Sequence, residues 1–248
     1  MKKLISLLLL ISSIIYGQEK NYTLEIDYIY TLNFTNLSSI YQINTKLTFN
    51  NNESIYEMDH LNSFANYDNV VDVDDNIQLA IKSNENEFVF KSFKNNDVYY
   101  SDMISMKKFD IKSKLDTIMS WTLSSETKNI LGYTCQKAVT EYGGRYYVAY
   151  FTSEIPIQNG PWRFHGLPGV ILEVESADNV FAIRATIINS NTSNIKINNP
   201  FNTKTVIAWD TFLKIYKKKY DEVLRNSMSK NGPTQELAKE GIIVYIKD

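Results

Sequence analysis

Residues 133–152 read YTCQKAVTEYGGRYYVAYFT, two runs rich in aromatic and β-branched residues on either side of Gly143-Gly144. Such runs are typical of strands, and paired glycines supply the positive φ angles that a tight hairpin turn requires. We therefore predict strands over Tyr133–Glu141 and Arg145–Thr152, joined as an antiparallel hairpin. A sheet built from such hairpins is the expectation for the rest of the chain.

The strand pattern continues on both sides of this hairpin. Tyr22–Tyr30 alternates apolar and polar residues, which is the period of a half-buried strand. Val170–Glu175 and Val180–Asn189 are rich in Val, Ile and Phe and flank a turn, so they predict a second hairpin near the centre of the sheet. Further strands are predicted over Ile40–Phe49, Ile77–Lys82, Glu87–Phe93, Val98–Asp102, Asp116–Leu123 and Ile242–Ile246.

One helix is predicted near the C-terminus. Asp210 is a suitable N-cap for a helix over about Thr211–Ser227, whose apolar residues form a stripe at helical spacing. We interpret Asn50–Asn76 as a long loop and find no internal repeat or second domain. The fold class is therefore α+β, a mainly antiparallel sheet with the C-terminal helix packed on it, in one domain over residues 18–248.

The first residues have the three parts of a secretory signal. Lys2 and Lys3 precede the apolar run Leu4–Ile15, and Gly17 suits the position before cleavage. About 12 apolar residues are too few to span a bilayer as a helix, which takes ~20. We predict a signal peptide over Met1–Gly17 and export to the periplasm, the outer membrane or the medium, with no transmembrane segment in the mature chain.

The composition excludes some classes of partner and cofactor. Without Lys2 and Lys3 the acidic side chains outnumber the basic ones by about four, which argues against nucleic acid as a partner. The acidic run at residues 71–76 lacks the glycine and the final glutamate of a calcium loop. One cysteine and two histidines are too few for a thiolate–imidazole zinc site. We therefore expect no cofactor, no metal site and no internal disulfide.

Residues 156–173, PIQNGPWRFHGLPGVILE, concentrate the turn-forming residues of the chain. Leu167-Pro168-Gly169 suits a type II turn, because proline fixes φ at its second position and glycine accepts positive φ at its third. The large apolar side chains of such a rigid loop either fill the domain's own core or form the mouth of a ligand site. The ligand-binding candidates are Trp162, Arg163, Phe164, His165 and Leu167, and the structural motif is Gly166, Leu167, Pro168 and Gly169.

The sequence resembles the GLPGLI family of exported envelope proteins. The resemblance rests on Gly166-Leu-Pro-Gly-Val-Ile171 and on the upstream segment from Lys128 to Ala138, which includes Gly132-Tyr-Thr-Cys135. It implies an exported protein and no particular activity. A weaker likeness to the half-barrels of LolA-like lipoprotein carriers implies that the sheet is curved and half-barrel-like.

These observations lead to a non-enzymatic binding or assembly protein of the cell envelope, with an apolar cleft near the Gly-Leu-Pro-Gly loop. Its expected partner is a lipid, a peptide or an envelope protein. The alternative is a thiol-dependent or hydrolytic enzyme that uses Cys135 and His165, although no sequence feature shows an activated thiol. No residue pattern supplies positive evidence for catalysis.

Overall fold

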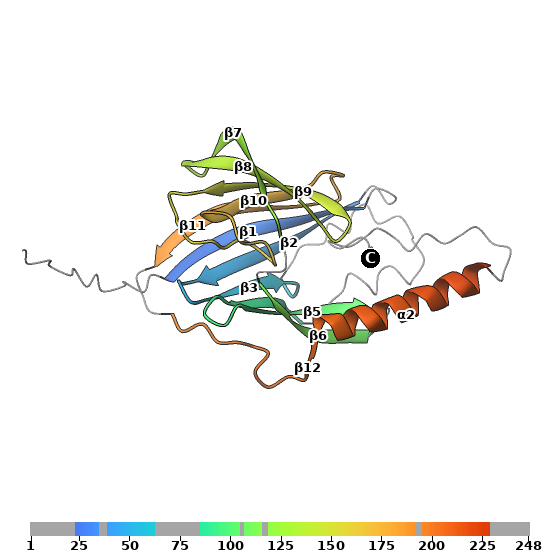
Figure 1. The fold of residues 1–248 in the computed structure, drawn as a ribbon. Helices are drawn as coiled ribbons and strands as arrows, with labels where there is room; N and C mark the ends of the chain where they lie inside the picture. Colours follow the sequence, from blue (N-terminus) through green and yellow to red (C-terminus); the bar gives the residue numbers. More distant parts are fainter. Residues whose placement is uncertain are drawn as a thin grey trace, which may run out of the picture.

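The computed structural model describes residues 23–34, 39–62, 85–104, 107–115, 119–191 and 195–228. In these residues the chain forms one open, curved sheet of twelve strands and one C-terminal helix (Figure 1). The mainly antiparallel, curved sheet and the C-terminal helix are thus confirmed, and they are consistent with the α+β class and with a half-barrel-like shape. The predicted signal peptide, the acidic run at 71–76 and the predicted strands Ile77–Lys82 and Ile242–Ile246 lie outside the described residues.

The sheet has the strand order β12-β6-β5-β4-β3-β2-β1-β11-β10-β9-β8-β7. Every neighbouring pair is antiparallel except β12 and β6, which are parallel. The two halves of the chain therefore meet where β1 pairs with β11. The strands are β1 (Thr23–Phe34), β2 (Ser39–Phe49), β3 (Glu53–Asp59), β4 (Glu87–Ser92), β5 (Asp97–Ile104), β6 (Lys107–Lys114), β7 (Thr122–Ile130), β8 (Tyr133–Tyr142), β9 (Arg145–Thr152), β10 (Val170–Ser176), β11 (Phe181–Asn191) and β12 (Val206–Ala208).

The two faces of the sheet differ in chemistry because side chains alternate along each strand. On β1, Ile26, Tyr28 and Tyr30 are buried on the face that carries the core, which we call the inner face. Asp27 and Ile29 alternate with them and lie on the opposite, outer face, where both are half-buried. The alternation predicted from the sequence therefore decides which residues pack and which meet solvent.

The loop between β9 and β10 fills the inner face. Phe164 packs against Tyr147 and Phe181 with ring centroids 5.2 and 6.3 Å apart, and Leu167 belongs to the same core. Lys91 of β4 holds the loop from the other half of the sheet, because its ammonium group donates three hydrogen bonds to residues 159–164. The core thus depends on the loop as well as on the strands.

The turn chemistry was predicted correctly at one end of this region and wrongly at the other. The β8–β9 hairpin turns at Gly143 and Gly144, which have φ angles of 57° and 77°. At Leu167-Pro168-Gly169 the predicted type II turn is wrong. The Gly169 amide donates to the Leu167 carbonyl at 2.7 Å, which makes a tighter three-residue γ-turn.

Several elements differ from the prediction. β3 lies within the predicted loop Asn50–Asn76, and β6 and β12 were not predicted. The helix α2 (Trp209–Met228) begins before Asp210, so Asp210 lies in its first turn rather than at the N-cap. Phe212 packs that first turn against Phe109 of β6, and the helix then extends beyond the sheet (Figure 1).

A second, smaller core covers part of the outer face. Ile197 and Phe201, from the segment that precedes β12, pack against Phe90 of β4. Tyr99 stacks on Phe201 with ring centroids 6.1 Å apart. This cover lies over β4 and β5, and the outer face of the neighbouring strands carries the groove described next.

Candidate functional site

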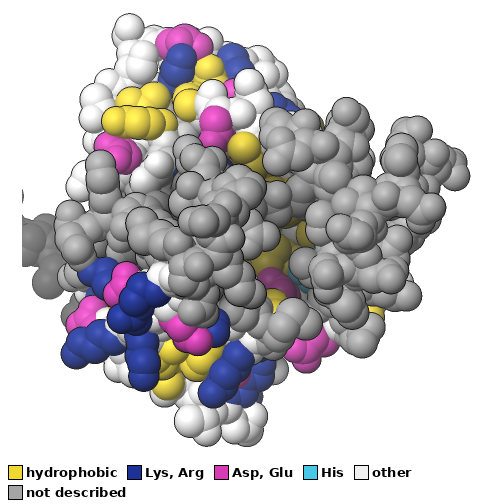
Figure 2. All heavy atoms as spheres, turned by 90° about the vertical axis from the view of Figure 1, so that its right-hand side faces the viewer, with side chains coloured by type: hydrophobic (Ala, Val, Ile, Leu, Met, Phe, Trp, Pro, Cys, Tyr) yellow, Lys and Arg dark blue, Asp and Glu magenta, His cyan; other side chains and the backbone are white. Residues whose placement is uncertain are grey.

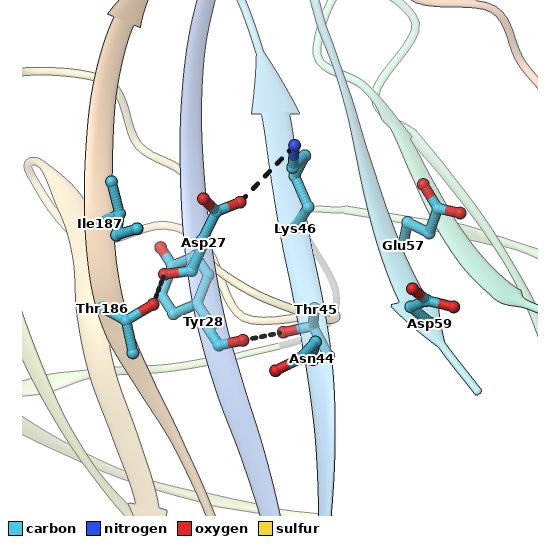
Figure 3. A pocket seen from close by; sticks show the side chains of 9 residues that line it. All are labelled: Asp27, Tyr28, Asn44, Thr45, Lys46, Glu57, Asp59, Thr186 and Ile187. Carbon is cyan, nitrogen blue, oxygen red and sulfur yellow. Dashed lines mark hydrogen bonds and ion pairs between the residues drawn. The ribbon is translucent and has the colours of Figure 1, made fainter. Parts of the chain in front are cut away.

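A groove of about 440 Å³ lies on the outer face of the sheet, where the two halves of the chain pair (Figure 3). Its volume is within the ~300–1,000 Å³ range of small-molecule sites. Four neighbouring strands, β11, β1, β2 and β3, supply its walls and floor. The lining residues are Asp27, Tyr28, Asn44, Thr45, Lys46, Glu57, Asp59, Thr186 and Ile187.

Strand register places the charged side chains of the groove in one row. Asp27 of β1 is opposite Lys46 of β2, and Lys46 is opposite Glu57 of β3. Directly opposed side chains have Cβ atoms ~4.5–5.5 Å apart. A second row beside the first pairs Asn44 with Asp59. The groove thus presents carboxylates, an amine and an amide side by side.

A β-bulge shapes the wall that β11 forms. Asp27 pairs with Ile187 and Tyr28 pairs with Ala185, so Thr186 is an extra residue on β11. A bulge bends the strand and redirects side chains. The Thr186 hydroxyl donates to the Asp27 carbonyl oxygen at 3.1 Å, and this bond fixes the bulge against β1. Ile187 then lies half exposed at the groove as its apolar component.

The groove is negatively charged overall, with three carboxylates and one amine. The Lys46 ammonium lies 3.7 Å from an Asp27 carboxylate oxygen, and both side chains reach solvent. Glu57 accepts a hydrogen bond from Asn86 at 2.8 Å, which orients its carboxylate. Among the described residues, no group of three or more His, Cys, Asp or Glu side chains is placed to hold a metal ion. The arrangement is suited to a ligand that both donates and accepts hydrogen bonds.

The candidate residues of the loop lie on the other face of the sheet. Trp162, Arg163, Phe164, His165 and Leu167 are all less than one-tenth exposed. Trp162, Phe164 and Leu167 belong to the main core. This agrees with the first of the two possibilities drawn from the sequence, in which the loop fills the domain's own core. The structure therefore brings these five residues together and separates them from the groove by the thickness of the sheet.

His165 is held by two backbone carbonyls. Its Nδ1 lies 2.9 Å from the Arg163 oxygen and its Nε2 lies 2.8 Å from the Leu115 oxygen. Burial and the charge of Lys91 lower the pKa of His165 to about 4, although the two carbonyls oppose this. Trp121 donates from its indole nitrogen to the His165 carbonyl at 2.8 Å. Both ring nitrogens are thus engaged with the backbone rather than with a nucleophile.

Cys135 has the environment of an inert thiol. It is fully buried, and its Sγ donates to the Tyr133 carbonyl at 3.6 Å. Burial raises the pKa of the thiol to about 11. An activated cysteine instead has a lowered pKa and a partner base. In the described residues no hydrogen bond joins Cys135 to His165, so the geometry does not support the thiol-dependent alternative.

The thiol environment makes a direct prediction. Ellman's reagent should label Cys135 roughly 100-fold or more slowly in the folded protein than in denaturant, because burial blocks access and the raised pKa suppresses the thiolate. The protein has one cysteine, so the absorbance reports this residue alone. Equal rates in the two conditions would show that the thiol is open and would revive the alternative.

Sequence reasoning did not find the groove. Alternation along Tyr22–Tyr30 places Asp27 on the polar face of a strand, yet it does not say which strand lies next to it. The pairing of β1 with β11 joins residues about 150 or more positions apart, and the bulge at Thr186 has no glycine or other local signal. Only the three-dimensional register assembles Asp27, Lys46 and Glu57.

Fold and groove together define a class: an open, curved, antiparallel β-sheet domain whose outer face carries a polar, solvent-exposed groove. The comparisons with known proteins make this more specific. The chain belongs to the family described as N-glycanase peptide, N-terminal domain, whose model matches residues 47–212. The matched region runs from the end of β2 into the first turn of α2 and so includes most of the sheet.

Solved structures agree on the fold. The structure of PNGF-II in space group C2 is 19% identical, has a TM-score of 0.51 and matches 80% of this chain and 32% of that chain. The structure of PNGF-II in space group P21 is 18% identical and has a TM-score of 0.51. The match covers 80% of this chain and 34% of that chain. The chain therefore spans about a third of the length of these proteins. No curated protein sequence matches it.

The family result corrects the resemblance drawn from the sequence. The assignment to the GLPGLI family and the likeness to LolA-like carriers are both wrong, because the family model and the solved structures are of the PNGase F-II kind. The Gly-Leu-Pro-Gly motif that suggested them has a local structural reason. Gly169 lies against the Thr152 backbone, where only glycine fits. In the part of the chain that the structure describes, no helix has the length and apolar character to cross a membrane.

Proposed function

We propose that this chain is a non-catalytic, carbohydrate-binding domain that serves an N-glycanase system, and that its sugar site is the groove on the outer face. The observation that carries the proposal is the groove itself, with its side-by-side carboxylates, amine, amide and hydroxyl. Membership in a family named for an N-glycanase supports a sugar as the ligand. This chain matches only about a third of the PNGF-II chains. The proposal therefore assigns the catalytic step to another part of such proteins.

The chemistry of the groove suits sugar hydroxyls. A hydroxyl group donates one hydrogen bond and accepts others, so a sugar site needs both acceptors and donors. Asp27, Glu57 and Asp59 supply charged acceptors, and Lys46 supplies a charged donor. The exposed fractions of the Lys46 and Asp27 side chains, 47% and 30%, leave these groups open to a ligand. Ile187 offers an apolar surface for the carbon face of a ring.

The proposal also includes the localisation and the possible partners that we expected from the sequence. We place the protein outside the cytoplasm because of the signal-like residues 1–17, and export brings it to glycans on other proteins. A lipid, a peptide or an envelope protein is the competing kind of partner, bound near Trp162–Leu167. The experiment below separates these partners from a sugar.

The test is isothermal titration of the purified protein with two probes, N,N′-diacetylchitobiose and a released high-mannose N-glycan. We expect saturable binding of at least one probe. Asp27→Ala and Glu57→Ala should each weaken it about tenfold or more, because a hydrogen bond to a charged group contributes ~1.5–3 kcal/mol.

The matched control is Glu53→Ala. Glu53 is a half-buried acidic residue on the same strand as Glu57 but does not line the groove, so its removal should leave the affinity unchanged. Binding that is absent in the unaltered protein, or equally weakened by all three variants, would overturn the proposal. Binding of phospholipid vesicles or unglycosylated peptides instead would favour the competing partners.

A further inference from the structure

Arg163 carries a buried charge without a carboxylate partner. Its side chain is only 1% exposed. In the described part of the chain, Arg163 forms no ion pair with a carboxylate, and its Nε and Nη1 have no hydrogen-bond partner. Nη2 donates to the Tyr142 hydroxyl. Fully buried arginines are rare unless they are paired, so this side chain requires an explanation.

Four aromatic rings surround the guanidinium and come from four separate segments. Its central carbon lies 3.9 Å from the Tyr100 ring centroid and 5.0 Å from that of Trp162. The rings of Tyr142 and Trp209 lie 5.3 Å away. Cation–π attraction stabilises the charge, but ring faces do not replace in-plane acceptors for every N–H group. The four rings thus surround the cation, while N–H groups of Arg163 remain without a hydrogen-bond acceptor.

A second donor points to the same place. The Tyr100 hydroxyl is buried and has no hydrogen-bond partner. Its ring centroid lies 3.9 Å from the Arg163 guanidinium carbon, so the two side chains are in contact. Unpartnered buried polar atoms are rare in folded proteins. Three of them on two adjacent side chains indicate an acceptor that binds to both side chains.

Asp102 is a candidate for an internal counter-ion because its charge acts on Arg163, but it is engaged otherwise. Its Oδ1 accepts the backbone N–H of Met103 at 2.7 Å. Burial raises the pKa of Asp102, although Arg163 opposes this. Burial also lowers the pKa of Arg163, but Tyr142, Tyr100 and Asp102 outweigh it, so the guanidinium remains charged. The cation therefore persists beside a carboxyl group that is not bonded to it.

The backbone next to Arg163 is strained. Trp162 has a φ angle of 48°, in the left-handed region that bulky residues rarely adopt. Such strain costs free energy and is concentrated at ligand-binding and catalytic sites. On the face of the molecule from which α2 extends, hydrophobic side chains are visible near the centre of the view (Figure 2). Strain beside a caged cation is a further sign of a binding site.

We propose that Arg163 and Tyr100 form a binding site for a single carboxylate group, distinct from the groove. The free N–H groups of Arg163 and the Tyr100 hydroxyl donate to the carboxylate, and the four rings exclude water. One cation matches one negative charge, so a monoanion leaves less buried net charge than a phosphate dianion. The carboxylate comes from an acidic sugar or from the C-terminus of a peptide.

The test is calorimetric titration of the full protein with N-acetylneuraminate and with N-acetylglycylglycine, each beside its neutral amide. We expect one of the two acids to bind and its amide to bind at least tenfold more weakly. Tyr100→Phe keeps the ring and removes the hydroxyl, so it should weaken binding about fivefold. Asp102→Asn removes the competing carboxyl group and should strengthen binding.

Two further variants keep the inference falsifiable. Tyr146→Phe, on an exposed tyrosine of the outer face, should leave acid binding unchanged. Asp27→Ala should also leave it unchanged, so the groove and this site can fail independently. If neither acid binds, or if the Tyr100→Phe protein binds the acid as well as the unaltered protein does, the carboxylate site is wrong. The identity of the acid that binds distinguishes a sugar from a peptide source.

Discussion

Gly169→Ala should destabilise the fold by ~3 kcal/mol or more, or prevent folding. A Cβ atom at this position would lie 2.0 Å from the Thr152 carbonyl oxygen and 2.6 Å from its carbon. Both atoms belong to the backbone of β9, so no side chain can move aside. The strand pairing that contains Thr152 would have to open, because β9 and β10 pair there through Val170.

Gly166→Ala is the matched control. Gly166 also has a positive φ angle, 89°, but its nearest neighbours are side-chain atoms of Trp121 at 4.0 Å. We expect a loss of only ~1–2 kcal/mol, the cost of a left-handed conformation in a residue with a Cβ atom. Urea unfolding followed by tryptophan fluorescence measures both. Equal losses in the two variants would contradict the role of close backbone approach at Gly169.

Lys91→Met should cost about 3–5 kcal/mol of folding free energy. The Lys91 ammonium is fully buried and donates to Asn159 Oδ1 at 2.9 Å, the Gly160 carbonyl at 2.7 Å and the Phe164 carbonyl at 3.0 Å. Burial lowers the pKa of this side chain well below its ordinary value. Methionine fills a similar volume but leaves the Gly160 and Phe164 carbonyls without this donor, each at ~1–3 kcal/mol, while Asn159 Oδ1 keeps only the Gly160 backbone N–H.

Lys112→Met provides the comparison on the surface. The Lys112 side chain is 41% exposed and pairs with Asp97 at 2.8 Å, and Lys114 keeps that carboxylate paired at 2.7 Å, so we expect a loss of only ~0–1 kcal/mol. The difference between the two variants in urea unfolding measures how strongly the loop depends on its anchor. A Lys91→Met protein as stable as Lys112→Met would show that the loop holds its place by apolar packing alone.

Local patterns in the sequence predicted the hairpins, because Gly143-Gly144 and the alternation around it act within a few residues. The same reasoning missed β3, although Ser54, Tyr56 and Met58 alternate inward, because Asn-rich and acidic neighbours hide a strand of seven residues. It also missed β12, which has only three residues and pairs in parallel with a distant strand. Strand order depends on long-range packing that no window of sequence contains.

The candidate sites show the same difference between local sequence patterns and long-range contacts. The loop residues Trp162–Leu167 were singled out because rigid turns and large aromatics are visible in sequence, and the structure places them on the inner face. The Lys91 anchor was not predicted, because it lies 68 positions from Asn159 and on another strand. The groove required the register of four strands and one bulge. Functional residues within one segment can be predicted from the sequence, whereas contacts between distant segments cannot.

The most direct test of the central claim is to map where a sugar binds. We would add N,N′-diacetylchitobiose, and then a high-mannose N-glycan, to isotope-labelled protein and follow the amide chemical shifts. The proposed function predicts shifts that cluster on β1, β2, β3 and β11 around Asp27, Lys46 and Glu57. Shifts confined to residues 156–169, or no shifts with either glycan, would contradict a sugar site in the groove.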